Sequence, residues 1–83
     1  MDLQDRIRHI LRDALQLGER ANSFSASTPL LGSIPEFDSM AVVSVLTMLE
    51  EEFGITVADD EISAATFETL GSLTAFVAEK VDA

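Results

Sequence analysis

The chain has 83 residues, a formal net charge of −10 and no cysteine, so disulfides, thiolate metal sites and a cysteine nucleophile are excluded. A hydrophobic content of 47% is ample for a compact core and argues against a disordered acidic tail. The short length favours one domain covering residues 1–83.

Basic and acidic residues are distributed unevenly along the chain. Four of the 5 Lys and Arg residues lie within the first 20 positions, whereas residues 21–78 contain acidic residues but neither Lys nor Arg. A strongly negative surface repels nucleic-acid phosphates and anionic lipids, and it attracts basic patches on other proteins. We therefore expect protein partners with basic patches, and no nucleic acid.

Nothing in the sequence predicts a targeting segment or a membrane span. Charged residues at positions 2, 5, 6 and 8 replace the apolar stretch of a signal peptide. The longest mostly apolar run, residues 40–49, is too short to cross a bilayer. We expect a cytoplasmic protein without membrane insertion and, because no flanking domain accompanies residues 1–83, a stand-alone monomer.

The first predicted helix begins after Asp2 and ends near Gly18. Its apolar residues recur at helical spacing and form one stripe: Leu3, Ile7, Ile10, Leu11, Ala14 and Leu15. Residues 19–38 are rich in Ser, Pro and Gly, which predicts a long loop. The apolar residues of this loop should hold it against the core: Leu30, Leu31, Ile34 and Phe37.

A second helix is predicted from Ser39 to Phe53. Asp38 is suited to the N-cap and Gly54 to the position that follows the helix. One face is sufficient for the core: Val42, Val45, Leu46, Leu49 and Phe53. The other apolar residues of the helix have no obvious place inside a small domain.

These surplus residues allow two interpretations. Met40, Val43 and Thr47 either pack inside a bundle that surrounds the helix, or they form an exposed strip that binds partners. Methionine suits the second interpretation, because its flexible side chain adapts to several surfaces.

The last third of the chain predicts two further helices. An acidic cluster at residues 59–61 followed by apolar residues suits a short third helix, and Thr69 can cap a fourth. The inner side of the fourth helix is expected to contain Leu70, Leu73, Phe76, Val77 and Val81. No segment alternates as a strand does. The predicted fold is all-α: a small four-helix bundle with a short third helix and a long loop between the first two.

Ser39 would be the first residue of the second helix. Backbone N–H groups lack acceptors there and the helix dipole is positive, so the position suits a phosphate. A serine beside a cap is most often only a capping residue, however. The sequence on either side of Ser39 is therefore needed to distinguish a capping serine from a functional one.

Three motifs follow one another in a fixed order. They are Asp38-Ser39-Met40, Leu-Glu-Glu-Glu-Phe at residues 49–53, and Asp-Asp-Glu-Ile at residues 59–62. Over almost the whole chain, this order resembles the acyl carrier proteins and their peptidyl carrier relatives. That family is marked by Asp-Ser-Leu at the start of the second helix, Leu-Glu-Glu-x-Phe near its end, and a following acidic turn.

The resemblance implies the acyl-carrier-protein type of bundle and a defined cofactor. Ser39 would carry 4′-phosphopantetheine, attached as a phosphodiester by a separate phosphopantetheinyl transferase, and Asp38 would belong to the motif that this transferase recognises. The arm ends in a thiol that holds acyl or aminoacyl groups as thioesters. Partner enzymes with basic docking patches, in fatty acid, polyketide or lipid biosynthesis, would load and use them.

The sequence departs from the family pattern before the serine. Five residues separate Gly32 from Asp38 where the family commonly has one, which makes Ser33 a rival attachment site. Ser33 lacks a preceding Asp and a following helix pattern. With its long loop and apolar early helix, the chain is similar to specialised bacterial carriers associated with exosortase and exopolysaccharide systems.

The second departure concerns the helix that partners would recognise. Ala41 and Ser44 stand where fatty-acid carriers usually have acidic residues, and the negative charge lies at residues 50–52 instead. We therefore predict apolar contacts near Ser39 and contacts with basic groups near the end of the helix. The predicted partner face consists of Met40, Val43, Ser44, Thr47, Glu50 and Glu51.

Other classes of function are weaker alternatives. A serine hydrolase needs a base, but His9 is the single histidine, it lies in the first helix, and no Gly-x-Ser-x-Gly motif is present. Residues 59–61 lack the alternating ligands and glycine of a calcium loop, so no metal site is predicted. A non-modified acidic helical module that docks onto a basic partner remains the alternative to a carrier protein.

Overall fold

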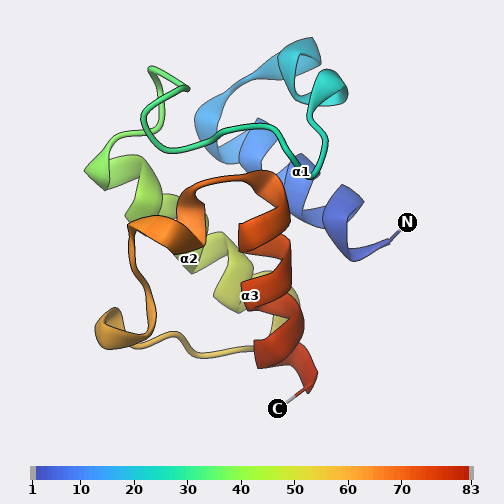
Figure 1. The fold of residues 1–83 in the computed structure, drawn as a ribbon. Helices are drawn as coiled ribbons and strands as arrows, with labels where there is room; N and C mark the ends of the chain where they lie inside the picture. The colour runs from blue at the N-terminus through green and yellow to red at the C-terminus, as the bar shows by residue number, and fades with distance from the viewer. Residues whose placement is uncertain (1, 83) are drawn as a thin grey trace.

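The computed structural model describes residues 2–82, except for the side chain of Asp59. Its helices, in chain order, are α1 (Leu3–Leu15), η1 (Gly18–Ser23), α2 (Ser39–Phe53), η2 (Asp59–Glu61), η3 (Ala64–Phe67) and α3 (Leu70–Asp82), where η denotes a 3-10 helix (Figure 1). The predicted all-α fold is confirmed. None of the helices between residues 2 and 82 has the length and apolar composition needed to cross a bilayer. Met1 and Ala83, the ends of the predicted domain, lie outside the described residues.

The bounds of α2 agree with the prediction because both of its ends are fixed locally. The Asp38 carboxylate accepts a hydrogen bond from the Ala41 N–H at 2.9 Å, and Gly54 ends the helix in the left-handed conformation with φ of 65°. The first helix stops earlier than predicted. Gln16 adopts the left-handed conformation after Leu15, so the helix ends before Gly18.

The predicted short third helix is formed by two 3-10 turns, η2 and η3. Ser63 interrupts the segment in an extended conformation, and its side chain and that of Thr66 satisfy each other's backbone N–H groups. Such local side-chain bonds compete with a continuous helix. The fourth helix, α3, has the predicted cap: the Ser72 N–H donates to Thr69 Oγ1 at 3.0 Å, and the Thr69 N–H donates to Ser72 Oγ at 3.0 Å.

The predicted loop between the first two long helices is ordered and contains η1. Backbone hydrogen bonds join it to the segment before α3, with Leu30 N–H to Glu68 O at 2.9 Å, and to the first turn of α3 itself, with Gly71 N–H to Ala26 O at 2.8 Å. The prediction that apolar side chains hold this loop on the core is confirmed for three of the four residues: Leu30, Ile34 and Phe37. Leu31 instead is 39% exposed, so that part of the prediction is wrong.

One hydrophobic core connects the long helices, the loop and η3. Its largest fully buried side chains are Ile7, Leu11, Leu30, Leu49, Leu70, Leu73, Val45 and Val77. Val81 was predicted on the inner side of the last helix but is 47% exposed. It lies in the last turn of α3, at the end of the bundle where the helix extends beyond its neighbours (Figure 1).

Candidate functional site

Ser39 is the exposed first residue of α2. The Asp38 side chain caps the Ala41 N–H, and the Asp38 carbonyl accepts from the Val42 N–H at 3.0 Å. The first N–H groups of a helix have no acceptor within it, and here those of Ser39 and Met40 precede the capped ones. The serine hydroxyl therefore lies beside free donors and the positive end of the helix dipole, where an attached phosphate is stabilised.

The segment before Ser39 is anchored in the core. Phe37 is 4% exposed and Ile34 7%, and the Phe37 N–H donates to the Ile34 carbonyl at 3.0 Å. The Phe37 ring meets Phe67 of η3 edge to face, with 5.6 Å between the ring centroids. This loop is longer than the family pattern, but the buried Phe37 holds its last residues against the core just before Ser39.

An ion pair on the surface joins the same segment to η1. The Arg20 guanidinium donates to both carboxylate oxygens of Glu36, through Nη1 to Oε2 and through Nη2 to Oε1 at 3.1 Å. These hydrogen bonds lower the pKa of the Glu36 carboxyl, and the hydrogen bond and the negative charge of Glu36 raise the pKa of Arg20. Both groups are thus charged over the neutral range.

The rival serine, Ser33, lies in a different local structure. It is exposed, follows Gly32 with φ of 87°, and donates its N–H to the Leu30 carbonyl at 3.2 Å within a turn. No helix begins at Ser33, so the donors and the dipole that surround Ser39 have no counterpart there.

The predicted partner face is exposed along the first turns of α2. Met40 is 81% exposed and Val43 63%, and both Ser44 and Thr47 are exposed. These values show that Met40 and Val43 do not pack inside the bundle, and whether the exposed strip binds partners stays a prediction. Thr47 differs in one respect, since its hydroxyl donates to the Val43 carbonyl at 3.0 Å and so is partly engaged by its own helix.

The three glutamates at the end of α2 have different surroundings. Glu50 is half-buried and its Oε2 accepts from the Val57 N–H at 2.9 Å, which fixes the turn after the helix. Glu52 forms an ion pair with Arg6 of α1 at 2.9 Å. Glu51 is exposed and has neither a side-chain hydrogen bond nor an ion pair among the described residues. Glu51 is therefore the glutamate whose charge is most available to a partner.

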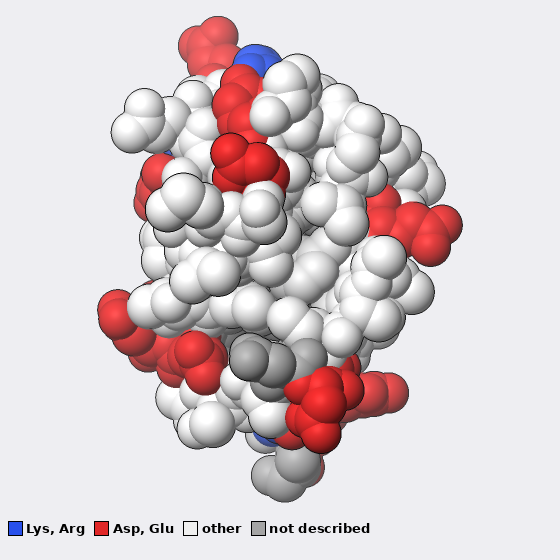
Figure 2. Space-filling model, turned by 90° about the vertical axis from the view of Figure 1, so that its left-hand side faces the viewer, with Lys and Arg blue, Asp and Glu red and all other residues white. Residues whose placement is uncertain are grey.

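Acidic side chains surround an uncharged area on the side of the molecule where α2 begins. Figure 2 shows the side on which η2 and the start of α2 lie in Figure 1, with a broad white area across the middle and acidic side chains above, below and on both sides of it. Few basic atoms are visible, as expected from the absence of Lys and Arg in residues 21–78. This side of the molecule therefore presents an uncharged area with acidic side chains around it.

An apolar pocket of about 280 Å³ lies beside the first turn of α2, which contributes Val42 to its lining. It is lined by Leu31, Val42, Ile62, Ser63, Ala64 and Phe67. The sequence analysis did not find this pocket, since its lining comes from three segments that only the fold brings together. Leu31, which the loop does not bury in the core, is one of these lining residues.

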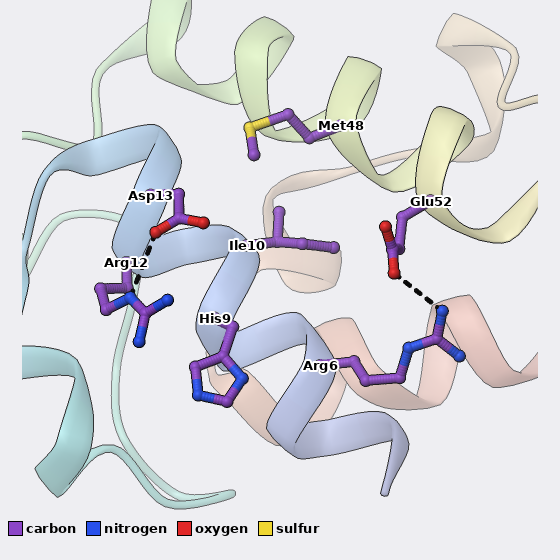
Figure 3. A pocket seen from close by; sticks show the side chains of 7 residues that line it. All are labelled: Arg6, His9, Ile10, Arg12, Asp13, Met48 and Glu52. Atoms are coloured by element: carbon purple, nitrogen blue, oxygen red, sulfur yellow. Dashed lines mark hydrogen bonds and ion pairs between the residues drawn. The ribbon is translucent and has the colours of Figure 1, made fainter. Parts of the chain in front are cut away.

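A second groove, of about 630 Å³, lies between α1 and α2 (Figure 3). Its lining consists of Arg6, His9, Ile10, Arg12, Asp13, Met48 and Glu52. Arg6 pairs with Glu52 across the groove and Arg12 pairs with Asp13 at 3.1 Å. Met48 follows Ser39 by nine residues, about 14 Å along the helix axis, so the groove is remote from the serine.

His9 belongs to this groove and not to the surroundings of Ser39. Among the described residues, no group of three or more His, Asp or Glu side chains is arranged to hold a metal ion. The geometry at Ser39 thus suits an attachment point for a phosphate ester, with helix donors and a cap but no neighbouring histidine to activate the hydroxyl.

The fold and the exposed serine at a helix start together define a small helical carrier domain. Residues 5–77 match the family described as Phosphopantetheine attachment site, and the chain belongs to this family. A similar solved structure is the solution NMR structure of a holo acyl carrier protein from Nitrosomonas europaea. It is 58% identical, aligns over 100% of both chains and has a TM-score of 0.92. The resemblance to the acyl carrier proteins found in the sequence is confirmed, and the likeness to one bacterial subfamily stays a prediction.

Proposed function

We propose that Ser39 is the residue to which 4′-phosphopantetheine is attached. The chain is a carrier protein that takes this group as a covalent cofactor. The observation that carries the assignment is the position of the Ser39 hydroxyl: exposed, directly after the capping Asp38, at the N-terminus of a 15-residue helix. Ser33 is exposed as well, but it begins no helix.

Attachment requires a donor whose pantetheine phosphate is activated as a pyrophosphate, such as coenzyme A. The Ser39 Oγ attacks the phosphorus that bears the pantetheine arm. A P–O bond to serine forms, the pyrophosphate P–O bond breaks, and the nucleotide half leaves. The hydroxyl proton passes to a base of the transferase or to solvent, so the carrier itself needs no catalytic base.

The function is that of an acyl carrier and not of an enzyme. The chain has no cysteine, so the thiol that holds the acyl group belongs to the arm. An acyl or aminoacyl group bound as a thioester is delivered to partner enzymes, which perform the chemistry. Fatty acyl, aminoacyl and polyketide cargoes are all compatible with the site.

The test of the attachment site compares Ser39→Ala with Ser33→Ala and Ser44→Ala. Each variant is incubated with coenzyme A and a phosphopantetheinyl transferase, and the intact mass is measured. We expect the mass of the arm on wild type, Ser33→Ala and Ser44→Ala, and no addition on Ser39→Ala. Modification of Ser39→Ala, or its loss in Ser33→Ala, would overturn the assignment.

A carrier of this family interacts with its modifying transferase and with enzymes that handle the acyl group. We propose that these enzymes dock on the exposed strip of Met40, Val43, Ser44 and Thr47, and that their basic groups reach Glu51. This placement is supported by the exposure of the strip and by the absence of an ion pair between Glu51 and any other described residue. Glu50 belongs to the same predicted face, but its carboxylate already holds the Val57 N–H.

Charge reversal tests this docking surface. Glu51→Lys should lower the kcat/KM of a partner enzyme more than Ser44→Glu does, because only the first change removes an existing attraction. Glu50→Lys should act in the same direction, but it also breaks the bond to Val57, so its unfolding free energy has to be measured in parallel. Equal effects of Glu51→Lys and Ser44→Glu would refute the placement.

The alternative of a non-modified docking module is not favoured, because the chain belongs to the phosphopantetheine attachment family. Mass spectrometry of the protein from its native host separates the two: the carrier should show the mass of the arm, and a docking module should lack it in every growth condition. A monomeric state and a cytoplasmic location remain predictions from the sequence.

A further inference from the structure

The ion pair of Arg20 and Glu36 links two parts of the loop that are far apart in the sequence. The two residues are 16 positions apart, and both nitrogens at the end of the guanidinium face both oxygens of the carboxylate. Bidentate pairs of this kind fix direction as well as distance, which a single surface contact does not. Glu36 lies two residues before Asp38 and three before Ser39.

Each partner of this pair stands on an anchored segment. On the η1 side, Leu17 is 4% exposed and Ala21 1%. On the other side, Ile34 and Phe37 are buried. Between those two residues only the exposed Pro35 and Glu36 project from the core, so the ion pair acts on the exposed bend that leads directly to the attachment site.

We propose that Arg20 is a positioning residue for phosphopantetheine transfer, acting through Glu36 to hold the bend before Ser39 in the arrangement that the transferase binds. The proposal rests on Ser39 being the attachment site. Arg20 touches neither the serine nor the cofactor in this account. It reduces the number of conformations that the bend must lose when the transferase docks, which lowers the entropic cost of binding.

The size of the effect follows from the exposure of the pair. Exposed ion pairs contribute little to global stability, and here both segments keep their own buried anchors, so the fold does not depend on the pair. A small local bias is nevertheless enough to change the population of the binding-competent bend. We therefore expect a change in KM of about two- to fivefold, with kcat and the melting temperature close to wild type.

Single variants, a double variant and a variant in which the two residues are exchanged distinguish the proposed positioning role of Arg20 from a simple effect of net charge. Arg20→Gln and Glu36→Gln each break the pair and change the net charge. The double variant Arg20→Gln/Glu36→Gln breaks the pair at unchanged net charge. The exchange Arg20→Glu/Glu36→Arg restores an ion pair. As matched controls, Arg12→Gln removes a guanidinium that pairs with its neighbour Asp13, and Glu19→Gln removes an exposed carboxylate of η1.

The experiment measures kcat and KM for the transfer of phosphopantetheine from coenzyme A to each variant. Both single variants and the neutral double variant should raise KM, whereas the exchange should return it toward wild type and the two controls should leave it unchanged. Amide hydrogen exchange of residues 33–38 should rise in the same three variants.

Several results would overturn the proposal. These are a wild-type KM in the neutral double variant, an effect of Arg20→Gln that the exchange does not reverse, or an equal effect of Arg12→Gln. An error in the assignment of Ser39 as the attachment site would be detected separately: in that case the Ser39→Ala variant would still accept the phosphopantetheine arm. If Ser39→Ala is inert and the pair variants behave as wild type, the positioning role alone is wrong.

Discussion

Asp38 shows how a single residue serves both the fold and the site. Its carboxylate accepts the Ala41 N–H and thereby fixes where α2 begins, and this in turn makes Ser39 the first helical residue. The same carboxylate directly precedes Ser39, the serine that we propose as the attachment site. A substitution at Asp38 therefore changes two properties that have to be measured separately.

Asp38→Ala should lower the free energy of unfolding by about 1 kcal/mol, because the Ala41 N–H loses its acceptor. Asp38→Asn retains an oxygen acceptor and should stay close to wild type. Urea unfolding followed by circular dichroism measures both. If modification by the transferase nevertheless falls in Asp38→Asn, the charge has a role beyond the cap; equal destabilisation by the two variants would contradict the capping role.

Glu36 gives a prediction for pH. Hydrogen bonding from Arg20 lowers its folded-state pKa below the usual 4.5, so the stabilisation by the pair is complete above the unfolded pKa and is lost as the pH falls through the folded pKa. In a titration of the side-chain carboxyl followed by NMR, Arg20→Gln should shift the Glu36 midpoint upward. Arg12→Gln should leave that midpoint in place, and a shift of equal size there would contradict the specific pairing.

At the scale of elements, the contact between the long loop and α3 depends on Gly71. A Cβ at this position would lie 2.8 Å from the carbonyl oxygen of Ala26, which itself accepts the Gly71 N–H. In an ordinary helix, replacing Gly by Ala stabilises by about 1 kcal/mol. Here the added methyl group has to push the loop away.

Gly71→Ala should therefore lower the melting temperature, although helix propensity alone predicts an increase. Ala75→Gly, at an exposed position of the same helix, serves as the control for propensity and should cost about 1 kcal/mol. Thermal unfolding by calorimetry measures both variants. A higher melting temperature for Gly71→Ala would mean that the loop and α3 are not in tight contact.

Elements with strong local determinants were predicted well. The bounds of α2 follow from Asp38 and Gly54, and the start of α3 follows from Thr69, because a cap is a contact between residues close in sequence. Two other segments were predicted less well. The third helix became two 3-10 turns through the local bonds of Ser63, and η1 was missed inside a stretch whose composition indicates a loop.

At the scale of the whole molecule, one core joins every long element. We propose that residues 1–83 fold as a single unit, and we expect chemical and thermal unfolding to be two-state. Transitions followed by circular dichroism and by NMR intensities should coincide, and the calorimetric and van't Hoff enthalpies should agree. Separate transitions for the loop of residues 19–38 and for the helices would contradict this.

The class of protein, the all-α fold, the negative surface and Ser39 as the candidate attachment site could all be predicted before the structure, because they depend on composition, on helical periodicity and on short motifs. The folded arrangement was needed to show which surplus residues are exposed, which glutamate carboxylate is not already engaged, and that Leu31, Val42 and Phe67 line one pocket. It also revealed the pairing of Arg20 with Glu36. Such contacts join residues far apart in the chain, and no local pattern specifies which distant partner a side chain will meet.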